Sequence, residues 1–568
     1  MKKKDLRSKE WFDNPKDPGL TALYLERYLN YGLKREDLQS GKPIIGIAQS
    51  GSDLSPCNRH FQALSNVIKD GIREAGGVPM EFPTHPIQET GKRPTAGLDR
   101  NLSYLSLVEV LYGYPIDGVI LTTGCDKTTP AALMAAATVN IPSIVLSGGP
   151  MLDGTYKGKK AGSGTIIWEA RRLHAKGEIS YEEFMDMAAA SAPSIGHCNT
   201  MGTASSMNSI AEALGMSLTG GAIIPAPYKE RESISFKTGK RIVEMVHEDL
   251  TPSKIMTKKA FENAIYVASA IGASSNCPPH LTAIARHMGI DFGIDNWEKL
   301  GHDIPLLVNC QPAGEHLMEG FFKAGGIPAI MQELMKNNKL HKDLMTVTGK
   351  TIAENLIEKI DIDENIIKSF KNPLVNNAGF IVMKSNFFNS AVMKTSVISS
   401  EFRKRYLSNP TSLNLFEANA VVFEGPEDYH LRINDESLNI DENSILMIRG
   451  CGPVGYPGSA EVVNMQPPDK LLKQGINTLP TLGDGRQSGT SESPSILNVS
   501  PESAIGGSLL IVETGDKIKI DLNNSRIDLM ISSEEIEKRR KKVKIPKLEN
   551  QTPWQEISRK MVGQLETG

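Results

Sequence analysis

The stretch Leu121–Pro150, LTTGCDKTTPAALMAAATVNIPSIVLSGGP, decides how this chain of 568 residues can fold. It begins at the end of an apolar run, DGVILTTG, which is typical of a buried strand. Cys125, Asp126 and Lys127 follow on a predicted turn, and a helix rich in small residues begins there. A thiol, a carboxylate and an amine together at a strand end are costly to bury without partners. We therefore expect a metal or catalytic site at this turn.

Strands and helices alternate on both sides of the stretch. Apolar runs at 43–50, 76–84, 117–124 and 141–147 are separated by segments with helical periodicity. This alternation predicts an α/β fold with a doubly wound parallel sheet. Ligands of such sheets gather outside the carboxyl ends of the strands. The residues that we expect at those ends are Cys57, Glu89 and Cys125.

The character of the chain changes near residues 371–389. Beyond them come short β-rich runs separated by Gly, Pro, Asp and Asn: AVVFE, ILMIRG, AEVVNM, SLLIVE, KIKIDL and RIDLMI. This spacing is typical of a β-barrel or sandwich. We predict an α/β domain over residues 1–374 and a β-rich, barrel-like domain over residues 375–568.

The composition indicates a soluble enzyme. Hydrophobic residues make up 40% and charged residues 23% of the chain, and the net charge of -3 gives no electrostatic reason to bind nucleic acid or an anionic membrane. The start, MKKKDLRSKEWF, lacks the apolar segment of a secretory signal, and no run is long enough to span a membrane. We expect a cytoplasmic protein whose dispersed cysteines serve a metal or catalysis instead of disulfides.

Three of the six cysteines share one local context, an apolar run followed by Gly, Ser or Pro and then Cys with a polar residue. They are Cys57, Cys125 and Cys198. A lone cysteine is more often a small buried hydrophobe, but three thiolates that converge could hold an iron–sulfur cluster with one iron left open. Cys198 precedes a predicted helix N-terminus, which favours a thiolate. The remaining cysteines, which we interpret as packing residues, are Cys277, Cys310 and Cys451.

Two interpretations fit the adjacent Asp126 and Lys127. They could form a surface ion pair of little energetic value. Alternatively, Lys127 carbamylated by carbon dioxide would become a carboxylate and join Asp126 and Glu89 around a hard cation such as magnesium.

Two glycine-containing stretches are not nucleotide sites. GCGPVGYPG (450–458) matches G-x-G-x-x-G, but Tyr456 and Pro457 follow it where a helix N-terminus is needed. The Gly349-Lys350-Thr351 sequence lacks the first glycine of a P-loop.

The glycine-rich loop GDGRQSGTS (483–491) is a candidate substrate loop. It carries Asp484, Arg486, Ser488 and Thr490, and Glu461 lies shortly before it. A solvated turn is the alternative reading, but glycines beside a serine also let backbone and hydroxyl approach a substrate closely. The sequence has no G-x-S-x-G elbow, which argues against a hydrolase triad.

In this order, PCNRH, GCDKTTPA, GHCNTMGTASSMNSIAEALGM, GYPGSAEVVNM and GDGRQSGTS resemble the dihydroxy-acid and sugar-acid dehydratase family. The resemblance runs from about Pro43 to Ile531. HPIQETGKRPTA and CNTMGTASSM are most similar to the aldonate dehydratases, especially those acting on L-arabinonate and D-xylonate. The branched-chain dihydroxy-acid dehydratases differ at the first of these loops and at the third cysteine.

The resemblance implies a role for each motif residue. It implies a 2Fe–2S cluster on Cys57, Cys125 and Cys198, although three cysteines also suit a four-iron cluster. It implies a magnesium ion held by Glu89, Asp126, Glu461 and Lys127 as its carbamate. Ser488 would be the base, ionised beside the magnesium, and Thr490 would contact the substrate. Glu492 departs from the glycine expected there, so it alters substrate end-group preference or simply faces solvent.

The implied activity is that of a hydro-lyase, which converts a sugar acid to its 2-keto-3-deoxy acid. A pentonate is the expected substrate, with L-arabinonate the leading candidate. The alternatives are a dihydroxy-acid dehydratase of branched-chain amino-acid synthesis and a non-catalytic iron–sulfur redox sensor. The family also implies a homo-oligomer, dimers or tetramers, and the expected partner is a small-molecule sugar acid, with no nucleic acid and no membrane.

Overall fold

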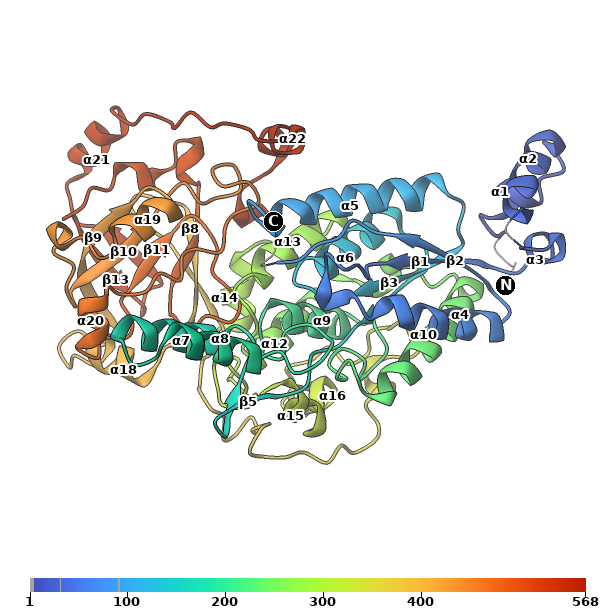
Figure 1. The fold of residues 1–568 in the computed structure, drawn as a ribbon, viewed down its shortest axis with the longest axis horizontal. Helices are drawn as coiled ribbons and strands as arrows, with labels where there is room; N and C mark the ends of the chain where they lie inside the picture. Colours follow the sequence, from blue (N-terminus) through green and yellow to red (C-terminus); the bar gives the residue numbers. More distant parts are fainter. Residues whose placement is uncertain (1–4, 31, 90–91) are drawn as a thin grey trace.

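The computed structural model describes residues 5–30, 32–89 and 92–568. The first four residues of the basic start therefore lie outside the described part, as do two residues of the loop that follows Glu89. Within the described part, no helix is both long and apolar enough to cross a bilayer. Three helices form an N-terminal arm, at the far right of Figure 1: α1 (Lys9–Phe12), α2 (Pro18–Leu29) and α3 (Arg35–Gln39).

A four-stranded parallel sheet forms the centre of the first half of the chain, which confirms the predicted sheet. In spatial order its strands are β2 (Val78–Pro83), β1 (Ile44–Gln49), β3 (Gly118–Thr123) and β4 (Ser143–Ser147). The three strands β1, β3 and β4 are buried along their whole length, as continuous apolar runs require.

Helices cover both faces of this sheet (Figure 1). On one face α5 (Ala96–Gly113) packs against α6 (Thr128–Val139), and on the other α4 (Phe61–Glu74) packs against α10 (Lys229–Glu248). The strand order reverses between β1 and β3, and right-handed crossovers then place α4 opposite α5 and α6. The sheet is therefore doubly wound.

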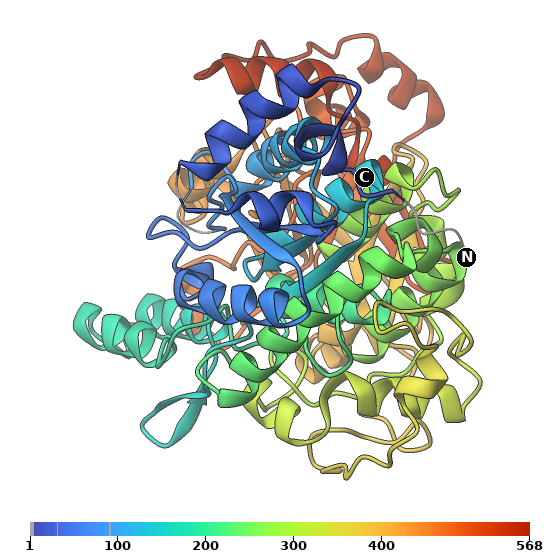
Figure 2. The same cartoon turned by 90° about the vertical axis from the view of Figure 1, so that its right-hand side faces the viewer.

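Further helices complete the first half, and α9 is buried along its whole length. α7 and α8, with the hairpin β5–β6, extend from the body of the molecule in Figure 2. The elements are β5 (Gly154–Tyr156), β6 (Lys159–Ala161), α7 (Thr165–Lys176), α8 (Tyr181–Ala190), α9 (Thr203–Ala213), α11 (Pro252–Ile255), α12 (Lys258–Ala270), α13 (Cys277–His287), α14 (Asp295–Gly301), α15 (Met318–Lys323), α16 (Gly326–Lys336) and α17 (Ile352–Asn355).

The second half contains an eight-stranded mixed sheet in the order β14-β13-β9-β10-β11-β12-β8-β7. The strands β9 to β12 are parallel, and the outer pairs are antiparallel. A bridge between Lys384 and Arg526 brings the two edges of the sheet together, so the predicted barrel-like form is confirmed. The strands are β7 (Phe380–Met383), β8 (Ser390–Lys394), β9 (Leu415–Phe423), β10 (Ser444–Ile448), β11 (Thr481–Gly483), β12 (Ile496–Ser500), β13 (Lys517–Asp521) and β14 (Arg526–Leu529).

Two of the six predicted β-runs are wrong. SLLIVE forms a 3₁₀ turn, η6 (Ser508–Ile511). Arg449 donates hydrogen bonds to the carbonyl oxygens of Leu509 and Val512, so these groups do not pair with a neighbouring strand. AEVVNM makes only one isolated bridge, between Glu461 and Arg486. Its backbone follows the site loop and does not join the sheet. The domain division at residue 374 stays a prediction.

Short helices surround this sheet, and the last one returns to the first half of the chain (Figure 1). Trp554 of that helix donates from Nε1 to the carbonyl of Leu98, at 3.1 Å. The helices are α18 (Ser400–Phe402), α19 (Pro426–Arg432), α20 (Asp469–Lys473), α21 (Ser533–Arg540) and α22 (Pro553–Met561).

The contact between α4 and α10 depends on two glycines. A Cβ atom on Gly239 would lie 2.4 Å from the carbonyl oxygen of Ile68, and one on Gly71 would lie 2.2 Å from that of Phe236. We predict that Gly239→Ala destabilises the fold by about 1–3 kcal/mol through overpacking, seen as a lower thermal midpoint. Gly113→Ala is the control, since a Cβ there meets nothing within 4 Å. Equal midpoints for both variants would contradict the close approach.

Candidate metal and active site

Three carboxylates from distant parts of the chain meet at the carboxyl end of the four-stranded sheet. Glu89 follows β2, Asp126 follows β3, and Glu461 comes from the loop after β10. One oxygen of each lies within 4.8 Å of the others. In the described part of the chain, no other group of three His, Cys, Asp or Glu side chains is this close. Such an oxygen set suits a hard divalent cation.

Two cations and an amide surround these carboxylates. The Lys127 Nζ atom, fully buried, lies 2.7 Å from Glu89 Oε2 and 3.6 Å from Glu461 Oε1. The Arg486 Nη1 atom lies 2.7 Å from Glu461 Oε1. The Asn276 side chain donates to the same oxygen, also at 2.7 Å. All three partners therefore converge on Glu461 Oε1.

Burial controls the protonation of the carboxylates. It raises the pKa of Asp126 to about 6, with Lys127 opposing and Glu89 adding to the rise. Burial, together with the nearby charge of Glu89, raises the pKa of Glu461 to about 7. For Glu89, burial alone would raise the pKa, but Lys127 and Arg486 outweigh it and lower the pKa. Glu89 is thus the carboxylate that stays ionised most readily.

The donor set fits a divalent cation. When all groups are ionised, three carboxylates against Lys127 and Arg486 leave one net negative charge. Lys127 Nζ and Glu89 Oε2 are both buried without a hydrogen bond of good geometry. Carbamylation of Lys127 would exchange an ammonium for an anionic oxygen donor at this point, which would strengthen the site for a hard cation.

The three predicted cysteines lie close enough to the turn to affect one another's ionisation. Cys57 lies in a 3₁₀ turn, η1 (Pro56–Asn58), and Cys198 lies between α8 and α9. A hydrogen bond from the Cys125 thiol lowers the pKa of Cys57. Gln88 Nε2 donates to Cys57 Sγ at 3.4 Å.

The thiols do not form a site for a single ion. No group of three that includes them has all its ligand atoms within 4.8 Å, among the described residues.

Burial opposes the thiolate that we predict at Cys198. Burial, and then the charge of Cys57, raise the pKa of Cys198 above its ordinary value. Ser163 Oγ donates to Cys198 Sγ at 3.3 Å and only partly offsets this. A bound metal would supply the positive charge that ionises the thiol. The other cysteines, all buried in hydrophobic cores, are Cys277, Cys310 and Cys451.

The turn that carries Cys125, Asp126 and Lys127 is fixed by a buried amide. Asn58 Oδ1 accepts from the Cys125 backbone N–H at 2.8 Å, and the side chain of Asn58 is fully buried. Because Asn58 is next to Cys57 in the chain, this one bond ties together the loops of two cysteines.

The serine loop reaches this region through Arg486 and through the Gln487 carbonyl, which accepts from Asn276 at 3.2 Å. Ser488 and Thr490 follow in the same loop. Their hydroxyl oxygens lie 2.9 Å apart, and the Thr490 backbone N–H donates to Ser488 Oγ at 3.3 Å. Glu492 is partly exposed and lies 3.3 Å from Arg172, as an ion pair. Asp484 has a structural role. Its carboxylate accepts from the backbone N–H groups of Gly450, Cys451 and Ser503 and so fixes the start of the loop to these two segments.

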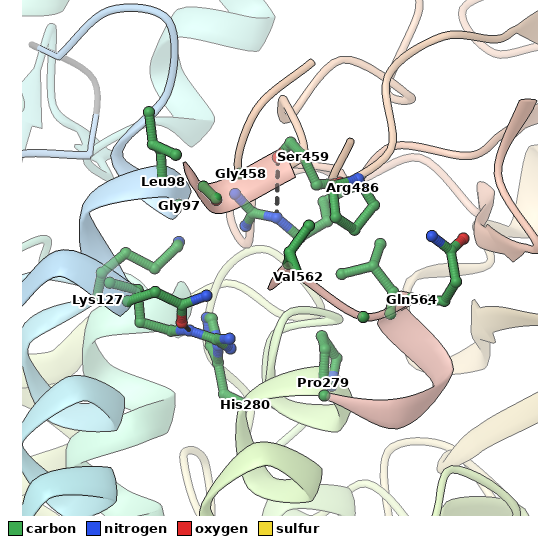
Figure 3. Close-up of a pocket in the computed structure, with 17 residues that line it drawn as sticks. Gly97, Leu98, Lys127, Pro279, His280, Gly458, Ser459, Arg486, Val562 and Gln564 are labelled. Atoms are coloured by element: carbon green, nitrogen blue, oxygen red, sulfur yellow. Dashed lines mark hydrogen bonds between the residues drawn. The ribbon is translucent and has the colours of Figure 1, made fainter. Parts of the chain in front are cut away.

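Lys127 and Arg486 also line a small cavity (Figure 3). Its volume is about 40 Å³, and α5, α13 and the segment 558–568 enclose it. This is room for about three water molecules.

Comparison with known proteins identifies the family. Residues 42–355 match the family described as "Dihydroxy-acid/6-phosphogluconate dehydratase N-terminal", and residues 365–568 match its C-terminal counterpart. The chain belongs to this family. The resemblance seen in the motifs is thereby confirmed.

Three relatives span nearly the whole chain. D-xylonate dehydratase of Caulobacter vibrioides is 61% identical over 99% of this chain and 94% of its own length. L-arabinonate dehydratase of Rhizobium leguminosarum bv. trifolii is 44% identical over 95% of this chain and 92% of its own. Dihydroxy-acid dehydratase of Acetivibrio thermocellus is 35% identical over 91% of each.

Sequence reasoning missed four polar residues of this region, and two of them had a visible signal. Asn58 directly follows a candidate cysteine, and Gln88 directly precedes Glu89. The other two come from segments whose periodicity indicates ordinary loops and helices; they are Ser163 and Asn276.

The raised pKa values predict how pH affects the metal-free protein. Since folded Asp126 and Glu461 bind protons more tightly than in the unfolded chain, the fold loses stability as pH rises from about 4 to about 7. At the higher pH, an added divalent cation should restore this stability, because protons no longer compete with the cation for the carboxylate oxygens. We predict a larger magnesium-induced rise in thermal midpoint at pH about 8 than at pH about 5.5.

Two glutamine variants test whether the cation binds at the carboxylates. Glu89→Gln should lose the magnesium effect, whereas Glu74→Gln, at an exposed carboxylate, should keep it. An equal magnesium effect at both pH values, or in both variants, would contradict a cation site here.

Proposed function

We propose that this protein is a hydro-lyase that removes water from an aldonate and yields the 2-keto-3-deoxy acid. The observation that carries the proposal is the 61% identity to a D-xylonate dehydratase over 99% of the chain. The carboxylate and thiol groups on one turn supply the chemistry that such a reaction needs. The higher identity favours D-xylonate over the L-arabinonate that the motifs suggested.

Two metal groups complete the proposed site. Cys57, Cys125 and Cys198 would hold a 2Fe–2S cluster. Glu89, Asp126, Glu461 and Lys127 as its carbamate would hold a magnesium ion. When bound, these groups would supply the positive charge that stabilises the developing enolate and the departing hydroxide.

A side chain of the protein would remove the proton from C2 of the substrate. Ser488 Oγ would take the C2 proton, and the C2–H electrons would form the C2–C3 double bond as the C3 hydroxyl leaves. The resulting enol then tautomerises to the keto acid, so one water is lost overall. A serine is a weak base at neutral pH, and the backbone N–H of Thr490 already donates to Ser488 Oγ. This contact stabilises the ionised oxygen.

A substrate panel tests the proposed activity. We expect anaerobically reconstituted protein to form keto acid from D-xylonate, and more slowly from L-arabinonate, with little from 2,3-dihydroxyisovalerate. Keto-acid release is the measurement. A preference for dihydroxyisovalerate would favour the branched-chain alternative, and no turnover of any aldonate would contradict the proposal.

A serine variant tests the base. We expect Ser488→Ala to lower kcat by about 10²–10⁴-fold, the usual contribution of a general base, while the visible absorption of the cluster remains. Ser493→Ala, two residues beyond that loop, is the control and should keep its activity. Loss of the cluster absorption in Ser488→Ala would instead assign this serine a structural role.

A further inference from the structure

A tryptophan outside every sequence motif contacts the serine loop. Trp168, on α7, donates from Nε1 to Thr490 Oγ1 at 3.1 Å. An indole N–H can only donate, so the Thr490 oxygen is the acceptor in this bond.

The Thr490 hydroxyl proton has one acceptor within reach. Thr490 Oγ1 lies 2.9 Å from Ser488 Oγ, and no other acceptor for this hydroxyl occurs among the described residues. Once Ser488 is ionised as the proposed base, its oxygen can only accept, so Thr490 then donates its own proton to Ser488. Ser488 Oγ also accepts from the Thr490 backbone N–H. Two donors thus point at the oxygen that must become negative.

Close packing fixes Thr490 in this position. A Cβ atom on Gly164 would lie 2.4 Å from Thr490 Oγ1, and one on Gly202 would lie 3.2 Å from its methyl carbon. Thr490 is only 8% exposed. The two glycines therefore let the threonine enter a slot that leaves its hydroxyl little freedom.

Helix α7 runs along the serine loop. Trp168 and Arg172 are one helical turn apart and so lie on the same face. They contact Thr490 and Glu492, which are alternate residues of the loop. Ser163, just before the helix, donates to Cys198 Sγ. One short segment thus touches both the serine loop and the thiols.

We propose that Trp168 is a positioning residue for the base: its indole N–H holds the Thr490 hydroxyl as a donor to Ser488 Oγ. This inference rests on the proposed function, in which Ser488 takes the C2 proton. Donors already aimed at the place where charge develops stabilise the transition state without reorganisation. Trp168 contributes to the chemical step through Thr490 and needs no contact with the substrate.

A double-mutant cycle tests this relay. The variants are Trp168→Phe, Thr490→Val and the double variant, each measured for kcat, KM and the isotope effect of C2-deuterated substrate. We expect Trp168→Phe to lower kcat about tenfold, as expected for one hydrogen bond near a charge, with KM nearly unchanged. The isotope effect should rise because proton abstraction becomes slower. In the Thr490→Val background, Trp168→Phe should cost nothing further.

Two variants provide the controls. Thr490→Ser keeps the hydroxyl and should retain most of the activity. Trp554→Phe loses an indole hydrogen bond of the same length, to Leu98 and away from the serine loop, and should leave kcat and the isotope effect unchanged.

The possible failures are distinguishable. If the effects of Trp168→Phe and Thr490→Val multiply, or if Trp168→Phe changes KM alone, the relay is wrong. Loss of iron in Trp168→Phe would also overturn it in favour of a structural role. If the unaltered protein dehydrates no aldonate, the proposed function fails instead.

Discussion

The structure depends on a buried set of ion pairs that the two halves of the chain share. The first half supplies Glu89, Asp126 and Lys127, and the second half supplies Glu461 and Arg486. The pairs also cross between the halves, with Lys127 3.6 Å from Glu461 and Arg486 3.8 Å from Glu89. A buried ion without a partner costs several kcal/mol. The first half alone would bury two carboxylates against one ammonium group, so it depends on Arg486 of the second half. The assembly of the site and the docking of the halves are therefore one event.

The second constraint is covalent. Cys125 faces the other thiols, while Asp126 and Lys127 face the carboxylates, and consecutive Cα atoms are about 3.8 Å apart. Two proposed metal groups are thus held side by side by adjacent residues of one turn, which Asn58 fixes from the neighbouring loop. Loss of water acts on adjacent carbons, so this short separation suits the proposed reaction. The serine loop reaches the same place from the second half, against α7.

Local patterns predicted the fold well and the site only in part. Buried apolar runs gave the parallel sheet, and its strand ends gave the positions of Cys57, Glu89 and Cys125. SLLIVE has the same apolar character but its carbonyls bind Arg449, which no local pattern reveals. Asn276 and Trp168 were missed because their partners lie 185 and 322 residues away. The ionisation of Cys198 depends on burial, which sequence does not show. The ligand roles themselves stay predictions.

The most direct test of the account is where iron binds. Crystals of anaerobically reconstituted protein, measured at the iron absorption edge, should show anomalous density only among the sulfurs of Cys57, Cys125 and Cys198. Lighter density without an iron signal should lie among Glu89, Asp126 and Glu461. Iron bound at the carboxylates, or thiols without iron in a protein that dehydrates an aldonate, would contradict the division of the site at this turn.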